Sequence, residues 1–447
     1  MASDRTQPAR TQAGESAPPV RHRRAWLITV LIVAFMVVNF ADKAVLGLSA
    51  HAIMVDLGIS ESTYGLISSS FYLLFSVSGL LVGFVSTRVS SRVLLCAMTA
   101  LWAVAQLPVL ALAAVPALIA NRVLLGAAEG PAASMSMHAL YEWFPPERRG
   151  LPSALQISGA ALGTLISAPL LTGVITTFGW RAAFGLLAVI SGVWSLIWFH
   201  VGRDGPYRDS GAQSTSPSAE ARMPYRKLLL NGTVLGSITS AFGAHWALTV
   251  SNAWLPVYLT GQLDMAPAAS ATTISVIAGL SLVLLLTVSP LVSGLKARGI
   301  SSRWSSGALQ GAAVLVAGVG MLAFPFVGAA GPRVVLIAVA FGCHAIALPL
   351  HYMTTAEVVP SRQRGAVFGI VAATGTLPGL IAPVLSGRLI DVAATEQAGY
   401  STAFLVSAVI MLLCGTFAAA AIRPERDVAR LEAEHRRRTT PSGLPCR

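Results

Sequence analysis

The chain has 447 residues, of which 54% are hydrophobic and 11% are charged. Soluble domains carry about 25% charged residues, so this composition excludes a soluble multidomain protein and indicates many membrane spans. The formal net charge of +12 could suit a nucleic-acid partner, but the placement of the basic residues between apolar runs favours contact with anionic lipid heads instead.

Apolar runs of about 20 residues, the length that a helix needs to cross roughly 30 Å of hydrocarbon, recur along almost the whole chain. Short polar or basic segments separate the runs. We therefore predict an all-α membrane protein with twelve membrane-spanning helices, at approximately 26–51, 63–84, 93–114, 117–140, 152–177, 181–201, 232–260, 268–293, 305–327, 332–353, 364–389 and 400–422.

The first 24 residues are polar and contain Pro and Arg. They lack an apolar core followed by a small-residue cleavage site, so we expect no cleavable signal peptide. Nearly all Lys and Arg residues fall in the two terminal segments or in every second loop. This bias predicts a multi-pass protein of the plasma or inner membrane with both termini in the cytoplasm. The exceptions are Lys43, Arg122, Arg181, Arg333 and Arg388.

The two halves of the chain resemble each other in sequence. FPPERRG at residues 144–150 matches VPSRQRG at 359–365, and APLLTG at 168–173 matches APVLSG at 382–387. Parallel repeats of this kind are typical of secondary transporters whose binding site lies between the halves near the membrane midplane. We expect the following organisation: a cytoplasmic tail at 1–24, a six-helix half at 25–201, a cytoplasmic linker at 202–230, a second six-helix half at 231–422 and a cytoplasmic tail at 423–447.

The fifth predicted helix carries Gly159 and Gly163, a small-xxx-small pair that lets helix backbones approach closely. Two interpretations stay open at this point. The pair could form a surface on which the halves slide during transport, or it could serve ordinary helix packing.

Four charged residues lie well inside apolar runs, namely Asp42 and Lys43 in the first helix and Arg122 and Glu129 in the fourth. A charge near the bilayer centre costs about 2.5–3.5 kcal/mol on insertion scales, so such residues usually have partners or a function. Neighbours in a helix point about 100° apart, so Asp42 and Lys43 are not each other's best partner. Arg122 and Glu129 are two turns apart on one helix face. The four charges sum to zero and are predicted to meet in a central cavity.

A buried carboxylate beside cations is suited to proton exchange near neutral pH. Protonation of Asp42 or Glu129 would leave the cavity positive and favour an organic anion. The alternatives are structural: Arg122 as an anchor, Lys43 reaching outward to the membrane surface, and Glu129 in a packing ion pair. The histidines of the apolar runs show no metal-site spacing and fit packing roles: His138, His245, His344 and His351.

Several of these segments resemble one known family. Residues 122–150, RVLLGAAEGPAASMSMHALYEWFPPERRG, and residues 179–198, GWRAAFGLLAVISGVWSLIW, are similar to the fourth-to-sixth helix region of the anion:cation symporter family within the major facilitator superfamily. NFADKAVLG at 39–47 resembles the family's first-helix N-Y-x-D-R-x-x-L pattern, and WLPVYL at 254–259 resembles the end of its seventh helix.

The resemblance implies the major facilitator fold, with two six-helix halves related by pseudo-two-fold symmetry, and proton-coupled uptake of organic anions such as sugar acids, hexuronates, phthalate-like aromatic acids or allantoate. It further implies that Asp42 and Glu129 are the protonation sites and that Lys43 and Arg122 form the carboxylate site. The partners expected are therefore a small organic anion, protons and membrane lipids, with no cofactor, no metal and no nucleic acid, in a monomer.

Three departures from the family concern the solute site. Lys43 replaces the usual Arg and cannot make the planar two-point contact of a guanidinium. Phe75 stands where sugar-acid carriers tend to have Tyr, and Thr376 stands near their binding Asn. These changes favour a less hydroxylated, aromatic or aliphatic carboxylate. Gln156 and Tyr72 are further candidate polar contacts.

The superfamily's gating motif between the second and third helices, G-x-x-x-D-R-x-G-R-[KR], is degenerate here. Gly83, Arg88 and Arg92 match it, but Thr87 replaces the acid and Ser90 replaces the second Gly. The charge network that closes this side in the superfamily is therefore incomplete, and Arg88 needs another acid or a lipid phosphate as its partner.

The leading hypothesis is a proton-coupled importer of a small carboxylate. An exporter of drugs or metabolites on the same scaffold is the alternative, because fold does not fix the direction of transport. An enzyme is not expected, since the sequence has no nucleophile–base pair, phosphate-binding loop or metal-ligand cluster above chance. A sensor would carry an additional soluble domain, for which the predicted tails are too short.

Overall fold

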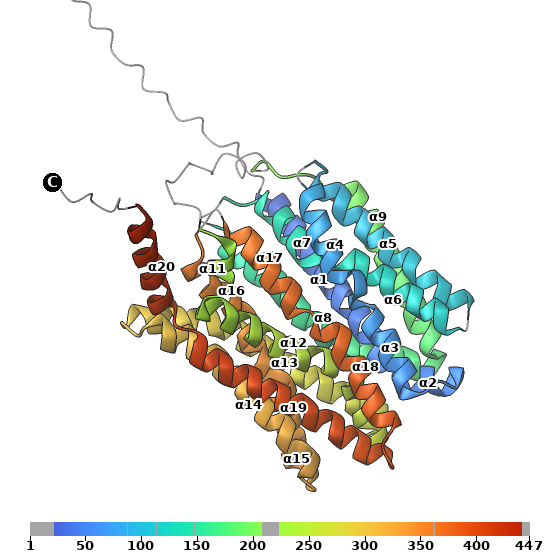
Figure 1. The fold of residues 1–447 in the computed structure, drawn as a ribbon. Coiled ribbons are helices and arrows are strands. Elements are labelled where there is room, and N and C mark those ends of the chain that lie inside the picture. Colours follow the sequence, from blue (N-terminus) through green and yellow to red (C-terminus); the bar gives the residue numbers. More distant parts are fainter. Residues whose placement is uncertain are drawn as a thin grey trace, which may run out of the picture.

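The computed structural model describes residues 22–86, 88–112, 114–145, 148–207, 223–360 and 363–439. Most of the predicted N-terminal tail, the last eight residues of the predicted C-terminal tail, most of the predicted linker and Thr87 lie outside these ranges. Within them the chain folds into helices without a strand (Figure 1).

Six helical segments form the first half of the described chain. They run between the two ends of the bundle, and short connections join each segment to the next. Their bounds are α1 (His22–Leu48) followed by α2 (Ala50–Leu57), α3 (Glu61–Ser70) followed by α4 (Tyr72–Val85), α5 (Ser91–Ala111), α6 (Val115–Glu129) followed by α7 (Ala132–Tyr141), α8 (Gly150–Phe178) and α9 (Trp180–Val201).

Six further segments form the second half. The short helix α11 (Tyr225–Leu229) precedes them and α20 (Pro424–Thr439) follows them. Their bounds are α12 (Gly232–Val257) with η2 (Tyr258–Gln262), α13 (Pro267–Ala297), η3 (Arg303–Ala308) with α14 (Leu309–Ala323) and η4 (Phe324–Phe326), α15 (Ala330–Gly342) with η5 (Cys343–Ile346) and α16 (Ala347–Val358), α17 (Arg364–Gly375) with α18 (Pro378–Asp391), and α19 (Glu396–Ala421).

The helices α11 and α20 lie at the end of the bundle where α1 begins (Figure 1). We call this end the terminal face. The opposite end, where α2 and the last turn of α18 lie, is the distal face.

Nine helical stretches among the described residues are long and apolar enough to cross a membrane. The other three predicted spans are α3–α4, α6–α7 and α12. The first two are interrupted, so neither contains one unbroken apolar helix of full length. Helix α12 is rich in Gly, Ser, Thr and Ala and is buried along most of its length, because other helices surround it instead of lipid. The prediction of twelve spans in two sets of six is thus confirmed.

The interruption between α6 and α7 has a local cause. A Cβ atom at Gly130 would lie 2.0 Å from the carbonyl oxygen of Phe75, so only glycine fits against α4. The next residue, Pro131, has no N–H for the helix ladder. A break in a membrane helix is tolerated where neighbouring protein or a cavity surrounds it, and this one directly follows Glu129.

The two halves contact each other through pairs of helices that the repeat makes equivalent. Within the first half α1 packs on α8 and α5 on α9, and within the second α14 and α12 pack on α19. Between the halves α8 packs on α13, α3 on α18 and α1 on α12. The second and fifth spans of one half thus meet the fifth and second spans of the other, as pseudo-two-fold symmetry requires.

Glycines bring the halves into backbone contact. A Cβ atom at Gly47 in α1 would lie 1.8 Å from the carbonyl oxygen of Asn252 in α12. A Cβ atom at Gly387 in α18 would lie 2.4 Å from the carbonyl oxygen of Glu61 in α3. Real Cβ contacts are not this short, so a larger residue at either position would force the helices apart.

Hydrogen bonds across the same interface close the distal face. The carboxylate of Asp391, at the end of α18, accepts hydrogen bonds from the backbone N–H groups of Glu61 (3.1 Å) and Ser62 (3.0 Å). It thereby caps the N-terminus of α3 from the opposite half, where a negative charge is favourable. The hydroxyl of Tyr64 donates to the carbonyl oxygen of Ala253, 3.2 Å away in α12.

The Gly159 and Gly163 pair has a different role. A Cβ atom at Gly159 would lie 2.7 Å from the Cβ of Met36, and one at Gly163 would lie 2.8 Å from the Cβ of Phe40. Both contacts join α8 to α1 within the first half. The pair therefore serves close packing inside one half, and the interpretation of a sliding surface between the halves is wrong.

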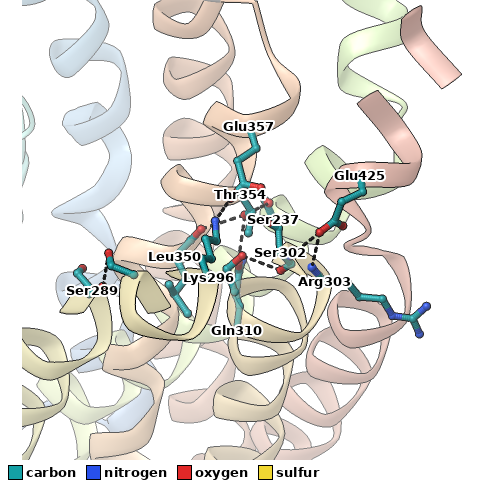
Figure 2. A network of polar contacts seen from close by, with 12 residues as sticks. Ser237, Ser289, Lys296, Ser302, Arg303, Gln310, Leu350, Thr354, Glu357 and Glu425 are labelled. Carbon is teal, nitrogen blue, oxygen red and sulfur yellow. Dashed lines mark hydrogen bonds and ion pairs between the residues drawn. The ribbon is translucent and has the colours of Figure 1, made fainter. Parts of the chain in front are cut away.

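Polar contacts tie the second half together at the terminal face (Figure 2). Lys296, near the end of α13, forms an ion pair with Glu357 in α16. Glu425, in the first turn of α20, accepts hydrogen bonds from the backbone N–H groups of Ser302 and Arg303, where the next span begins. An acid that follows the last span thus caps the first turn of the ninth.

The first half repeats this arrangement. The sequence VSSRV at residues 89–93 corresponds to ISSRW at 300–304. Asp204, which follows α9, accepts a hydrogen bond of 3.3 Å from the backbone N–H of Arg92 in the first turn of α5. The internal repeat therefore extends to the caps of the third and ninth spans.

We expect Gly47→Ala to destabilise the closed distal face, because overpacking at a tight contact costs about 1–3 kcal/mol. Spin labels on cysteines introduced at the exposed positions Val55 and Val392, in a variant whose native cysteines are replaced, should report a longer distance component by pulsed electron resonance. Gly173→Ala is the control, since no atom lies within 4 Å of its added Cβ. Equal distance distributions in both variants would contradict the expectation.

Candidate functional site

The four buried charges predicted from the sequence lie in one cluster in the first half. Asp42 and Lys43 come from α1, and Arg122 and Glu129 come from α6. Asp42, Arg122 and Glu129 are at most 1% exposed. A cluster of this burial is expensive unless its charges compensate one another.

Lys43 and Glu129 form a direct ion pair. The Lys43 Nζ lies 2.9 Å from the Glu129 Oε2, and its side chain is 13% exposed while that of Glu129 is fully buried. The ammonium also donates a hydrogen bond to the side-chain oxygen of Asn39, one turn earlier on α1. The lysine therefore points into the protein toward α6, and the alternative in which it extends to the membrane surface is wrong.

Aromatic rings surround the same ammonium. Its distance to the ring centroid is 4.5 Å for Phe40, 5.7 Å for Phe75 and 5.8 Å for Phe71. Each ring face offers a cation–π attraction in a site where water is scarce. Phe75, predicted from the sequence as a site residue, thus contributes to the environment of Lys43.

Asp42 and Arg122 are connected through amide side chains. The Gln106 Nε2 donates to the Asp42 Oδ1 at 2.8 Å, and the Asn121 Nδ2 donates to the Gln106 Oε1 at 3.0 Å. The Arg122 Nε donates to the Asn121 Oδ1 at 2.8 Å, and its Nη1 donates to the backbone oxygen of Asp42 at 3.2 Å. The guanidinium is therefore held beside Asp42 without an ion pair between the two side chains.

Some polar atoms of the cluster have no hydrogen-bond partner among the described residues. They are the Asp42 Oδ2, the Arg122 Nη2 and the Glu129 Oε1. A buried polar atom without a partner costs about 1–3 kcal/mol and calls for an explanation. Unused acceptors can take up a proton, and an unused guanidinium N–H can bind an anion.

Two cavities adjoin the cluster. The first, which we call the charge pocket, lies between the halves, and its walls include Lys43, Tyr72, Arg122, Thr249 and Asn252. The second, which we call the apolar cavity, has a volume of about 160 Å³. Asn252 lines both. The walls of the apolar cavity include Phe40, Ala44, Leu48, Asn252, Phe341 and His344.

The remaining predicted solute contacts separate into two groups. Tyr72 lines the charge pocket, and the Thr376 hydroxyl is joined to that of Ser76 by a hydrogen bond of 2.7 Å across the halves. Gln156 lies outside both cavities, and its amide donates to the Ser136 Oγ at 2.8 Å. In this structure Gln156 joins α8 to α7, and its contact with the solute stays a prediction.

The residues of the gating motif lie at the terminal face. Gly83 is in the last turn of α4, and Arg88 follows this helix with an exposed side chain. The Arg92 Nη2 donates to the backbone oxygen of Phe199 at 2.6 Å, within the first half. Among the described residues, these contacts attach the motif to its own half.

Residues that the sequence interpretation missed complete the site. Gln106, Asn121 and Asn39 link the charges, and Asn252 joins the two cavities. Each is a carboxamide inside a predicted span. Buried carboxamides at bilayer depth are a usable signal, because each needs partners that lipid does not supply.

Comparisons with known proteins found a family model and relatives that cover most of the chain. The sequence model described as the Major Facilitator Superfamily matches residues 30–383. A hexuronate transporter of Bacillus subtilis is 25% identical over 89% of this chain and 95% of its own. A probable sulfoacetate transporter of Cupriavidus necator is 24% identical over 84% of this chain and 88% of its own.

Solved structures share the fold. A bacterial homologue of the human lysosomal transporter Spinster, in an inward-facing and unoccupied conformation, superposes with a TM-score of 0.75 at 14% identity, covering 92% of this chain and 99% of that one. A D-xylose–proton symporter superposes with a TM-score of 0.72 at 17% identity, covering 90% and 99%.

We expect Lys43→Met to lower the stability of the purified protein by about 3–5 kcal/mol, because it leaves Glu129 buried without its cation. The double variant Lys43→Met with Glu129→Gln should recover much of this loss. Thermal unfolding in detergent measures both. Lys296→Met is the matched control, since its pair with Glu357 is about one third exposed and should contribute less than about 1 kcal/mol. A double variant less stable than Lys43→Met would contradict the pairing.

Proposed function

The chain belongs to the Major Facilitator Superfamily, and on that premise we propose that it imports a small organic anion together with a proton by alternating access. Membership makes it a membrane transporter and not an enzyme. Fold alone does not select a solute, so the proposal depends on the cluster of charges and on the two cavities beside it.

The observation that carries the proposal is the contact between Lys43 and Glu129 at the charge pocket. The two side chains are 2.9 Å apart, and Lys43 also lines the pocket. While Glu129 is ionised, its carboxylate is paired with the Lys43 ammonium. A proton on Glu129 removes this competitor and frees the Lys43 ammonium for the carboxylate of a solute. Proton and anion therefore bind together without covalent chemistry.

Arg122 and Asp42 form the second part of the proposed coupling site. Arg122 also lines the charge pocket, and one of its N–H groups has no partner among the described residues. We propose that this group provides a second contact for the anion. The four charges sum to zero, so adding the anion and one proton leaves the cluster neutral. An anion alone would bring an uncompensated negative charge into a buried site.

The names of the relatives support an anionic solute. The two relatives described above are a hexuronate transporter and a probable sulfoacetate transporter. A D-galactonate transporter of Escherichia coli is 27% identical over 54% of this chain and 60% of its own. Hexuronate, sulfoacetate and galactonate are all carboxylates. We infer that a carboxylate is also the group that this chain recognises, with Lys43, Arg122, Tyr72, Phe75 and Thr376 around its path.

We further propose that the protein lies in the plasma or inner membrane as a monomer with both termini in the cytoplasm. The distribution of Lys and Arg supports this orientation. In that orientation the distal face, which the hydrogen bonds of Asp391 to α3 help to close, is the external one. The two six-helix halves would then move as units about the contacts of α8 with α13 and of α3 with α18.

We expect purified protein in liposomes to accumulate a radiolabelled carboxylate when the outside is made acidic. Glucuronate, galactonate, sulfoacetate and benzoate are the probes. Glu129→Gln should lose gradient-driven accumulation at least about tenfold while keeping exchange of labelled for unlabelled solute, because the neutral amide imitates the protonated acid.

Glu396→Gln is the matched control, since Glu396 is exposed at the distal end and bonds Gln262 within its own half. Accumulation that is driven by a sodium gradient and not by a proton gradient would contradict the assignment of the proton as the coupling ion. Acid-driven loss of solute from the liposomes would favour the exporter, and full proton-driven accumulation in Glu129→Gln would exclude this residue as the coupling site.

A further inference from the structure

We propose that the transported anion is a ring carboxylate: a carboxylate attached to one ring-sized apolar body that carries a single hydrogen-bonding substituent. This inference rests on the proposed function and defines the solute class of the same site. It is carried by the size and walls of the apolar cavity, by its link to Lys43 and by the unpaired nitrogen of His344.

The volume of the apolar cavity fits one ring. At about 160 Å³ it is close to the cavity of about 150 Å³ that accepts benzene in another protein. Its walls are mostly hydrocarbon, as a ring requires. Besides side chains of α1 they include Ile274, Ile277 and Leu285 of α13 and Leu348 of α16.

The carboxylate position and the apolar cavity are adjacent. The Phe40 ring lines the apolar cavity, and its centroid lies 4.5 Å from the Lys43 Nζ. Ala44, the residue after Lys43, lines the same cavity, and Asn252 lines both cavities. A carboxylate held at Lys43 therefore has its body directed past Phe40 and Asn252 into the apolar walls.

The same walls disfavour a sugar acid. Each hydroxyl that is buried without a partner costs about 1–3 kcal/mol in proteins. The polar side chains of the apolar cavity are few, namely Thr164, Ser251, Asn252, Ser281 and His344. The Ser281 hydroxyl already approaches the backbone oxygen of Gly342 at 3.5 Å. The other four polar side chains would have to pair with every hydroxyl of a sugar acid, whereas a ring with few hydroxyls makes no such demand.

His344 offers a polar contact for a substituent of the ring. It is 3% exposed, lines the apolar cavity from η5, and its Nδ1 has no hydrogen-bond partner among the described residues. Two other histidines of the second half differ. The Nδ1 of His245 lies 2.8 Å from the backbone oxygen of Ala241, and that of His351 lies 3.2 Å from that of Ala347. His344 alone of these three keeps its Nδ1 available for a hydroxyl or amine of the solute.

Calorimetric titration of the purified full-length protein at pH 5.5 tests the ring. Benzoate, cyclohexanecarboxylate, 4-hydroxybenzoate and galacturonate are the probes, and each ring carboxylate should bind at least about tenfold more tightly than galacturonate. Galacturonate binding as tightly as benzoate would overturn the inference and leave the proposed function standing. Failure of all four acids to bind would remove the proposed function itself.

Two variants locate the ring and its polar group. Ala278→Phe narrows the apolar cavity and should weaken benzoate at least about tenfold, while Ala420→Phe, exposed on α19, should not. The unmodified protein should bind one of the two isomers, 3-hydroxybenzoate or 4-hydroxybenzoate, several-fold more tightly than benzoate. In His344→Phe the affinity for that isomer should fall to about the affinity for benzoate. An unchanged preference for that isomer, or no preference for either isomer in the unmodified protein, would overturn the role of His344.

Discussion

A buried positive charge near the middle of the first half is the constraint on which the rest of the site depends. The Lys43 ammonium needs a counter-charge, and Glu129 provides it at 2.9 Å. The helix that carries this carboxylate is interrupted directly afterwards, and Gly130 fits against α4 only because it has no side chain. The amide chain through Gln106 then supports the second pair of charges. Charge, helix break and close packing are thus one arrangement.

Much of the fold could be predicted from the sequence, because bilayer thickness fixes the length of a span and the repeat fixes the two halves. The breaks inside spans could not, because they depend on contacts with other helices, as at Gly130. The membership of the charge cluster was predictable, since four ionisable residues in apolar runs are conspicuous. Their pairing was not, because it depends on helix rotation and on the relay through Gln106 and Asn121. Gln156 illustrates the same limit: a polar residue in a span can satisfy a neighbouring helix instead of a solute.

The two halves use equivalent parts for different purposes. In each half, an acidic residue after the last span caps the first turn of that half's third span. This residue is Asp204 in the first half and Glu425 in the second. Among the described residues, the buried cluster of charges lies in the first half, whereas the second half contributes Asn252 and His344 to the cavities. The charges thus come from one half, the walls of the apolar cavity come from both, and the two cavities exist only where the halves face each other.

The glycine contacts between the halves also bear on leakage. At Gly47 and Gly387 the seal consists of backbone pressed on backbone, without long side chains that would have to find new rotamers each time the halves separate. Such a joint leaves little room for a file of water molecules along which protons could hop. Under the proposed proton coupling, any such path would waste the gradient, so these contacts would protect the gradient as well as shape the protein.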